Sequence, residues 1–96
     1  MNFSSEQINE YKAKNPDGLM LLTSGTKSCI VKKPNRALLS LMLSKSRDPL
    51  AMVDILLENC WVDGDAELKE DTAFMYSVME KIDDIVGKKT VELKNL

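Results

Sequence analysis

At 96 residues, with 44% hydrophobic residues and a net charge of −2, the sequence is that of one small folded domain. It has no histidine and only two cysteines, so it lacks the commonest general base and the four ligands of a structural zinc site, and we expect no enzymatic activity, no metal and no other cofactor. It also lacks the ~20-residue apolar run of a membrane span and an N-terminal export signal, so we expect a cytoplasmic protein with reduced cysteines and no membrane partner.

The first predicted element is a short helix over residues 4–14. Ser4 is followed three positions later by Gln7, which is the spacing of a capping box. An Asn-Pro-Asp-Gly run then ends the helix, because proline disfavours helix in the residue before it and Asp-Gly favours a turn. Since this helix has few apolar residues, we divide the single globular chain into an N-terminal helical arm, residues 1–17, and a hairpin-plus-helices domain, residues 18–96.

Two strands are predicted next, over residues 19–23 and 28–33. Residues 24–27 between them have the length and the glycine of a hairpin loop. Both faces of the first strand carry apolar side chains. An isolated hairpin is unstable in water, so this one must pack on helices or pair its edges with another chain.

Two helices follow the hairpin. Asn35 is a candidate N-cap for a helix from Ala37 to Lys45. Asp48 is a candidate N-cap for a second helix that starts at Pro49 and runs to about Trp61, since proline is well tolerated in the first helical position. The second helix is apolar on most of its circumference, which predicts either a central position in the core or a place in an interface.

The last third of the chain reads as a turn, a long helix and an end segment. Residues 62–65 predict a turn, and residues 68–86 carry apolar side chains at helical spacing. Gly87 is typical of a helix end, with Lys88 and the following lysine beside the negative end of the helix dipole. Residues 90–96 are compatible with one more helical turn or with a tail.

These elements predict a helix-dominated α+β fold: an N-terminal helix, one β-hairpin, and three helices packed around a single core. Free cysteine is usually buried, so Cys60 is expected in the core. We expect the further core positions Leu56, Leu57, Val78 and Ile82. As candidate protein-interface residues we single out Leu39, Leu43, Met52, Ile55 and Trp61.

Three charged clusters suggest sites, and each has a plainer interpretation. The acidic run Asp63, Asp65 and Glu67 starts like a calcium loop but lacks its glycine and its final glutamate, which favours an acidic turn. The other two clusters are best interpreted as solvated surface. They are the basic residues Lys27, Lys32, Lys33 and Arg36 and the carboxylates Glu80, Asp83 and Asp84. The basic cluster is of the kind that contacts phosphate, but the chain as a whole is acidic, so we do not expect nucleic acid as a partner.

Charge is divided unevenly between the two halves of the chain. Residues 1–48 contain eight lysines and arginines and four aspartates and glutamates, a net charge of +4, whereas residues 49–96 contain five and eleven, a net charge of −6. Such polarity can orient head-to-tail association between copies of the chain or steer a charged partner. It is equally compatible with two solvated faces.

Two short motifs resemble those of the small bacteriophage tail assembly chaperones. They are Lys32-Lys33-Pro34-Asn35-Arg36 after the hairpin and Leu56-Leu57-Glu58-Asn59-Cys60 at the end of the apolar helix. The continuation Trp61-Val62-Asp63-Gly64-Asp65 and the Leu93-x-x-Leu96 end are also similar, so the resemblance covers about residues 18–96. The helix at residues 4–14 has no counterpart in it.

The resemblance implies a non-enzymatic chaperone that binds the phage tape measure protein, keeps its hydrophobic helices in solution and assists tail tube assembly in the host cytoplasm. It also implies frequent self-association, and it leaves open whether a longer frameshifted form exists. The alternative function is a small structural virion component, such as a connector or a capsid accessory protein. A third possibility is a small regulator that binds nucleic acid through residues 27–36.

Overall fold

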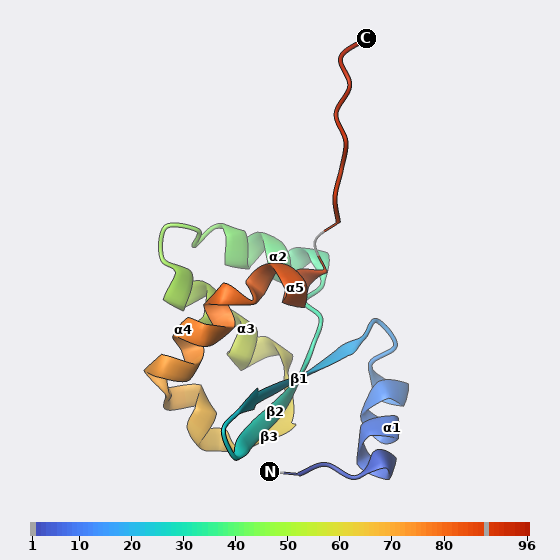
Figure 1. Cartoon of the computed structure of the whole chain (residues 1–96), viewed down its shortest axis with the longest axis vertical. Coiled ribbons are helices and arrows are strands. Elements are labelled where there is room, and N and C mark those ends of the chain that lie inside the picture. Colours follow the sequence, from blue (N-terminus) through green and yellow to red (C-terminus); the bar gives the residue numbers. More distant parts are fainter. Residues whose placement is uncertain (1, 88) are drawn as a thin grey trace.

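The computed structural model describes residues 2–87 and 89–96 (Figure 1). In this part of the chain a three-stranded sheet lies among five α-helices and one short 3-10 helix. The fold is therefore α+β and helix-dominated, as predicted. In chain order the elements are α1 (Ser5–Lys14), β1 (Leu19–Ser24), β2 (Lys27–Lys32), α2 (Arg36–Leu43), α3 (Pro49–Cys60), β3 (Trp61–Gly64), η1 (Ala66–Glu70), α4 (Thr72–Glu80) and α5 (Ile82–Val86).

The sheet is antiparallel, with the strand order β1-β2-β3. Ser24 pairs with Lys27, so the hairpin turn has two residues and is shorter than the predicted four-residue loop. Gly25 in this turn has a φ of +62°, a conformation that glycine adopts without steric cost. The tight turn fixes the register of β1 and β2 over all six residue pairs.

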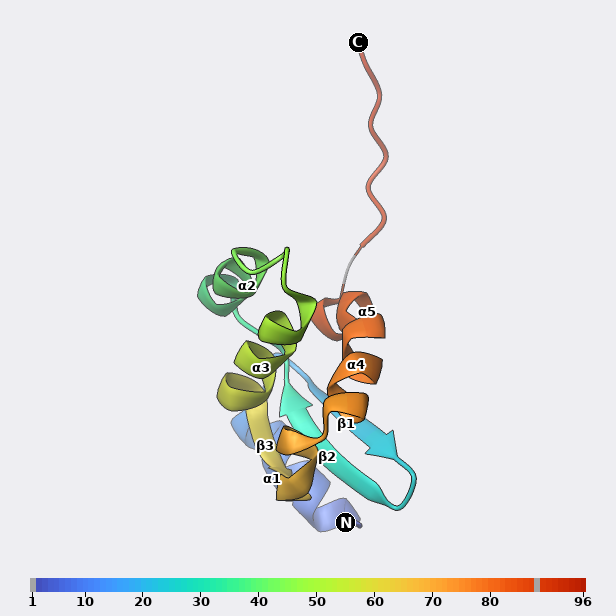
Figure 2. The ribbon, with the colours of Figure 1, turned by 90° about the vertical axis from the view of Figure 1, so that its left-hand side faces the viewer.

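The core lies between the sheet and the helices α2 to α5, which cover one of its faces (Figure 2). Cys29 and Val31 of β2 point into it, because alternate residues of a strand share a face. The predicted core residues Leu56, Leu57, Cys60 and Val78 are buried, whereas Ile82 is half-buried at its margin. The remaining buried core residues are Met42, Val53, Leu68, Phe74, Met75 and Ile85.

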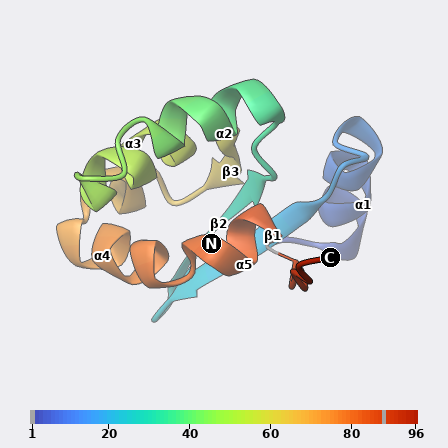
Figure 3. The same ribbon diagram turned by 90° about the horizontal axis from the view of Figure 1, so that it is seen from above.

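Helix α1 lies on the other side of the sheet from α2, α3 and α4 (Figure 3). It begins with the predicted capping box between Ser4 and Gln7, and none of its residues is buried. The Tyr11 hydroxyl donates a hydrogen bond to Asp63 Oδ2 over 2.6 Å. Asp63 pairs with Ile30 in the sheet, so this bond ties α1 to the outer face, where Ile30 is buried.

The third strand is the main difference from the sequence-based expectation. Residues 62–65 were predicted to form a turn, but Trp61–Gly64 forms β3 and pairs with β2. Local Asp-Gly chemistry favours a turn, whereas pairing with a distant strand satisfies the backbone groups of this segment and takes precedence. The glycine at position 64 allows β2 and β3 to approach closely, since a Cβ on it would lie 2.5 Å from the Cα of Cys29.

The predicted long helix over residues 68–86 is also wrong, because the segment is divided into η1, α4 and α5. Asp71 breaks it: its side chain accepts a hydrogen bond from the backbone N–H of Phe74 over 3.1 Å and caps α4. A second break at Lys81 separates α4 from α5. Because of these two breaks, Leu68 of η1 and Ile85 of α5 both reach the core, although the two elements run in different directions.

Other predicted helix ends are confirmed. Asn35 and Asp48 cap α2 and α3 through their side chains, although α2 already ends at Leu43. Gly87 ends α5 in the left-handed conformation. Of the two lysines predicted beside this end, Lys88 lies outside the described residues. Residues 89–96 form an extended tail rather than a helical turn, and they project from the end of α5 (Figure 1).

Candidate functional site

The five predicted interface residues are spread over α2, α3 and β3. Leu43 is exposed and Leu39 is half-buried on α2. Met52, Ile55 and Trp61 are half-buried and pack against the margin of the core. Trp61 also carries the Lys69 ammonium over its ring, with 4.5 Å between Nζ and the ring centroid. These residues do not define one site, whereas two cavities of the protein are bordered by apolar side chains.

The first cavity, which we call the α2 groove, has a volume of about 510 Å³ and lies between α2, the end of α3 and the chain before β1. Its apolar wall includes Ala37, Leu38 and Leu41 of α2 and Cys60 of α3. Leu41 is 49% exposed, and Leu43 on the same short helix is 55% exposed. Sequence reasoning missed Leu41 because apolar residues surround α2 on most sides and do not mark one face.

Basic and amide side chains form the polar part of the lining of the α2 groove. Lys14, Lys32 and Lys33 line it together with Asn15, Asn35 and Asn59, and Asp17 is the one acidic residue among its lining residues. Lys33 reaches past the groove toward Gly87, where a Cβ would lie 2.8 Å from its Nζ. The groove thus combines an exposed leucine, Leu41, with an excess of positive charge.

The side chain of Cys60 contributes apolar surface to this groove and does not act as a nucleophile. Burial raises its pKa, and the positive charge of Lys32 offsets part of that increase. The other thiol, Cys29, is fully buried, and burial together with the negative charge of Asp65 raises its pKa to about 11. Both cysteines are free and remain protonated at neutral pH, where the reactive thiolate form is scarce.

The second cavity, which we call the β1 groove, has a volume of about 540 Å³ and runs between strand β1 and helices α4 and α5. Met20 and Leu22 of β1 line it on one side. Phe74, Val78 and Ile85 line it on the helical side, and the charged residues Glu80, Lys81 and Asp84 border it. No sequence motif marks this groove, because it depends on how the hairpin packs against helices 50 residues later.

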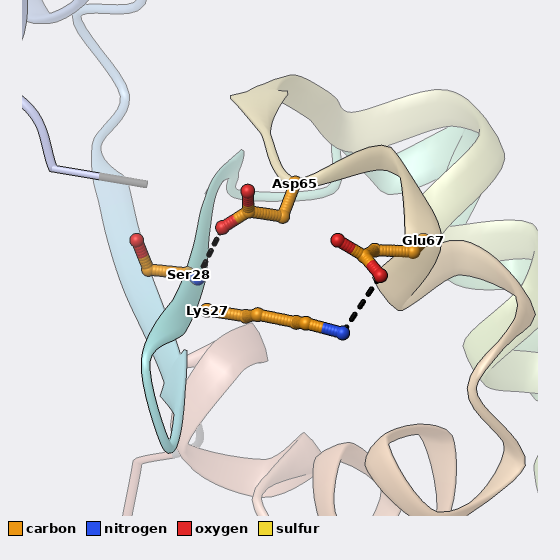
Figure 4. A network of polar contacts seen from close by, with 4 residues as sticks. All are labelled: Lys27, Ser28, Asp65 and Glu67. Carbon is orange, nitrogen blue, oxygen red and sulfur yellow. Dashed lines mark hydrogen bonds and ion pairs between the residues drawn. The ribbon is translucent and has the colours of Figure 1, made fainter.

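Three of the charged residues that the sequence offered as ligands, Lys27, Asp65 and Glu67, have partners within the protein. Lys27 Nζ forms an ion pair with Glu67 Oε2 over 2.7 Å, and the backbone N–H of Ser28 donates to Asp65 Oδ2 over 3.0 Å (Figure 4). The hydrogen bond from Lys27 to Glu67 raises the pKa of the lysine. These contacts fasten the start of β2 to the segment that follows β3, which is a structural role.

The predicted basic cluster is divided in space, since Lys32 and Lys33 border the α2 groove while Lys27 lies at the other end of β2. Among residues 2–87 and 89–96 we find no cluster of three or more cysteine, aspartate or glutamate side chains placed to hold a metal ion. No helix within these same residues is both long and apolar enough to cross a membrane.

Comparison with known proteins gives no match: no family model fits the chain, and no curated protein or solved structure is significantly similar to it.

Proposed function

We propose that this chain is a non-enzymatic phage tail assembly chaperone, which binds and solubilises the tape measure protein in the host cytoplasm and assists assembly of the tail tube. The α2 groove is the proposed binding site. The proposal combines the resemblance of two short motifs with the position of those motifs around one cavity.

The observation that carries this proposal is the convergence of the two motifs. Lys32, Lys33 and Asn35 belong to the motif after the hairpin, and Asn59 and Cys60 belong to the motif at the end of α3. All five residues line the α2 groove, although the motifs are separated by α2 and most of α3. A shared role at this groove accounts for both motifs.

The chemistry of the α2 groove suits a client of a particular kind. An amphipathic helix can place its apolar stripe on the exposed Leu41 and the neighbouring Leu38 of the groove, and thereby remove them from water. Full burial of one leucine side chain contributes about 1.5–3 kcal/mol. The lysines that line the groove favour a client whose apolar stripe is flanked by acidic residues. Such contacts would hold a long hydrophobic helix in solution.

The experiment is a pull-down and solubility assay after co-expression with the tape measure protein of the same phage. Wild type is expected to co-purify with it and to raise its soluble fraction. Leu41→Glu places a charge in the groove and is expected to weaken binding at least about tenfold, because an apolar contact is replaced by a desolvated carboxylate. Tyr76→Glu is the matched control, since Tyr76 is an exposed aromatic residue of α4 outside both grooves.

The outcomes of this assay test both the client site and the chaperone function. Loss of binding in Leu41→Glu with retention in Tyr76→Glu supports the α2 groove as the client site. Equal binding by both variants places the client elsewhere and removes the groove from the proposal. A wild-type chain that neither binds nor solubilises the tape measure protein overturns the chaperone function.

The second candidate function is a small structural component of the virion. The observation that favours it is that no described strand pairs with the outer edge of β1, because a repeated assembly can pair such an edge with neighbouring copies. Quantitative mass spectrometry of purified mature particles separates the two functions. A structural component is present in a fixed stoichiometric amount, whereas an assembly chaperone is absent from the finished particle.

A further inference from the structure

The two edges of the sheet differ in how well they are protected. β3 has four residues, an irregular register opposite Ile30 and Val31, and a charged residue, Asp63. β1 has six residues in regular register and no charge or proline. Short, irregular or charged edges resist further pairing, whereas a long, regular, apolar edge invites it. Within the described residues no strand pairs with the outer edge of β1.

The backbone of β1 offers a defined set of groups at this edge. The N–H of Lys33 donates to the carbonyl of Gly18, which makes this pair a hydrogen-bonded one. Hydrogen-bonded and non-hydrogen-bonded pairs alternate along antiparallel strands. The N–H and C=O groups of Leu19, Leu21 and Thr23 therefore point outward. The Leu21 side chain is 57% exposed, and the β1 groove runs along the helical side of the same strand.

The same chain carries an extended segment with matching properties. Residues 89–96 are extended, and Val91 and Leu93 are 85% and 91% exposed. Lys89, Val91 and Leu93 share one face of an extended chain, while Glu92 and Leu96 lie on the other. At about 3.3 Å per residue, these eight residues exceed the length of the six-residue strand β1.

We propose that residues 89–96 of one copy add as a strand to the outer edge of β1 in a second copy, with Val91 and Leu93 in the β1 groove. Both residues then bury their side chains beside Met20 and Leu22. Leu96 falls on the opposite face, which carries the exposed Leu21.

Two observations favour a second copy over the segment's own chain. The segment leaves the end of α5 and projects away from the fold (Figure 1). Gly87 at its root lies near Lys33, whose Cδ is 3.6 Å from a Cβ placed on Gly18, and Gly18 precedes the start of β1. If the segment paired with β1 of its own chain, it would begin beside the start of that strand and run parallel to it. A second copy allows the more stable antiparallel pairing.

The interface joins different surfaces of the two copies, so each copy still has one free edge and one free segment. Such contacts produce rings, of which the reciprocally exchanged dimer is the smallest, or open chains. This association does not involve the α2 groove and is independent of the proposed client. Failure of one proposal therefore leaves the other standing.

Two variants of the full chain test the two sides of this contact separately: the donor segment, residues 89–96, and the acceptor edge of β1. Val91→Asp/Leu93→Asp removes the donor side chains, and Leu21→Pro blocks the acceptor edge by removing an outward N–H that the sheet itself does not use. Each variant alone is expected to self-associate at least about 100-fold more weakly than wild type, because two apolar side chains or the edge pairing is lost. Circular dichroism and thermal unfolding of each variant establish that it is folded. Tyr76→Glu is again the control.

Light scattering after size-exclusion chromatography gives the decisive result. Wild type is expected to grow in molar mass with concentration, and each variant to remain a monomer. An equal mixture of the two variants is expected to form a dimer and nothing larger, because only one donor–acceptor pair is intact. The proposal is overturned by a wild-type monomer at high concentration, which includes pairing within one chain, by variants that associate like wild type, or by a mixture that stays monomeric. Should Leu21→Pro fail to fold, Thr23→Pro, whose N–H also points outward, takes its place.

Discussion

The arm (residues 2–17) and the body (residues 18–87) are held in place by different means. Helix α3 of the body buries four of its twelve residues in the core, whereas α1 of the arm buries none of its ten. Among the described residues, the arm is capped locally and is joined to the sheet by the hydrogen bond from Tyr11 to Asp63, on the face where Ile30 is buried. The body therefore carries the cooperative stability of the protein, and the arm is able to detach locally without unfolding it.

The largest expected effect is that of a cavity in the body. Leu56 is fully buried at the centre of α3, and Leu56→Ala is expected to reduce the free energy of unfolding by about 2–5 kcal/mol. Urea unfolding followed by circular dichroism measures it. Leu41→Ala, at an exposed position of α2, is the control and is expected to change stability by less than about 0.5 kcal/mol. Equal effects at the two positions would contradict the assignment of the core.

A smaller loss of folding stability is expected from replacing a glycine that the fold of the body requires. Gly64 has a φ of +151°, and a Cβ would lie 2.5 Å from Cys29 Cα, so Gly64→Ala is expected to cost about 2–3 kcal/mol. Gly25→Asn is the matched control, because nothing lies within 4 Å of a Cβ there and asparagine tolerates a positive φ. Thermal unfolding compares the two variants. A harmless Gly64→Ala would show that β3 is not held against β2 as described.

The smallest global effect is expected in the arm. Tyr11→Phe removes the 2.6 Å hydrogen bond to Asp63 and leaves the ring in place. The midpoint of global unfolding is expected to change little, while amide hydrogen exchange in α1 becomes several-fold faster, because this bond opposes local detachment. Tyr76→Phe, on exposed α4 surface, serves as the control. A large drop in global stability would mean that the arm and the body unfold as one unit.

The sequence predicted those parts of the fold that depend on local chemistry. The caps at Ser4, Asn35 and Asp48 and the stop at Gly87 are confirmed, because each depends on residues within one turn. It failed where distant segments decide. β3 exists because β2 is available to pair with it, and no local pattern around Asp63-Gly64 contains that information.

The candidate site followed the same division between local and distant information. The two motifs were visible in the sequence, but their meeting at the α2 groove follows from the packing of α2 against α3. Leu43 was predicted as an interface residue and is exposed, whereas Met52 and Ile55 pack against the core margin. A helix that is apolar on most sides gives no indication of which side its neighbours cover.

Trp61 gives the protein a built-in optical probe, since it is the single tryptophan of the chain. Its indole is half-buried at the junction of α3 and β3, beneath the Lys69 ammonium, and the preceding residue, Cys60, lines the α2 groove. Its emission therefore responds to unfolding of the body. A client helix without tryptophan that docks in the α2 groove, which the preceding residue Cys60 lines, can be titrated by intrinsic fluorescence, without any label.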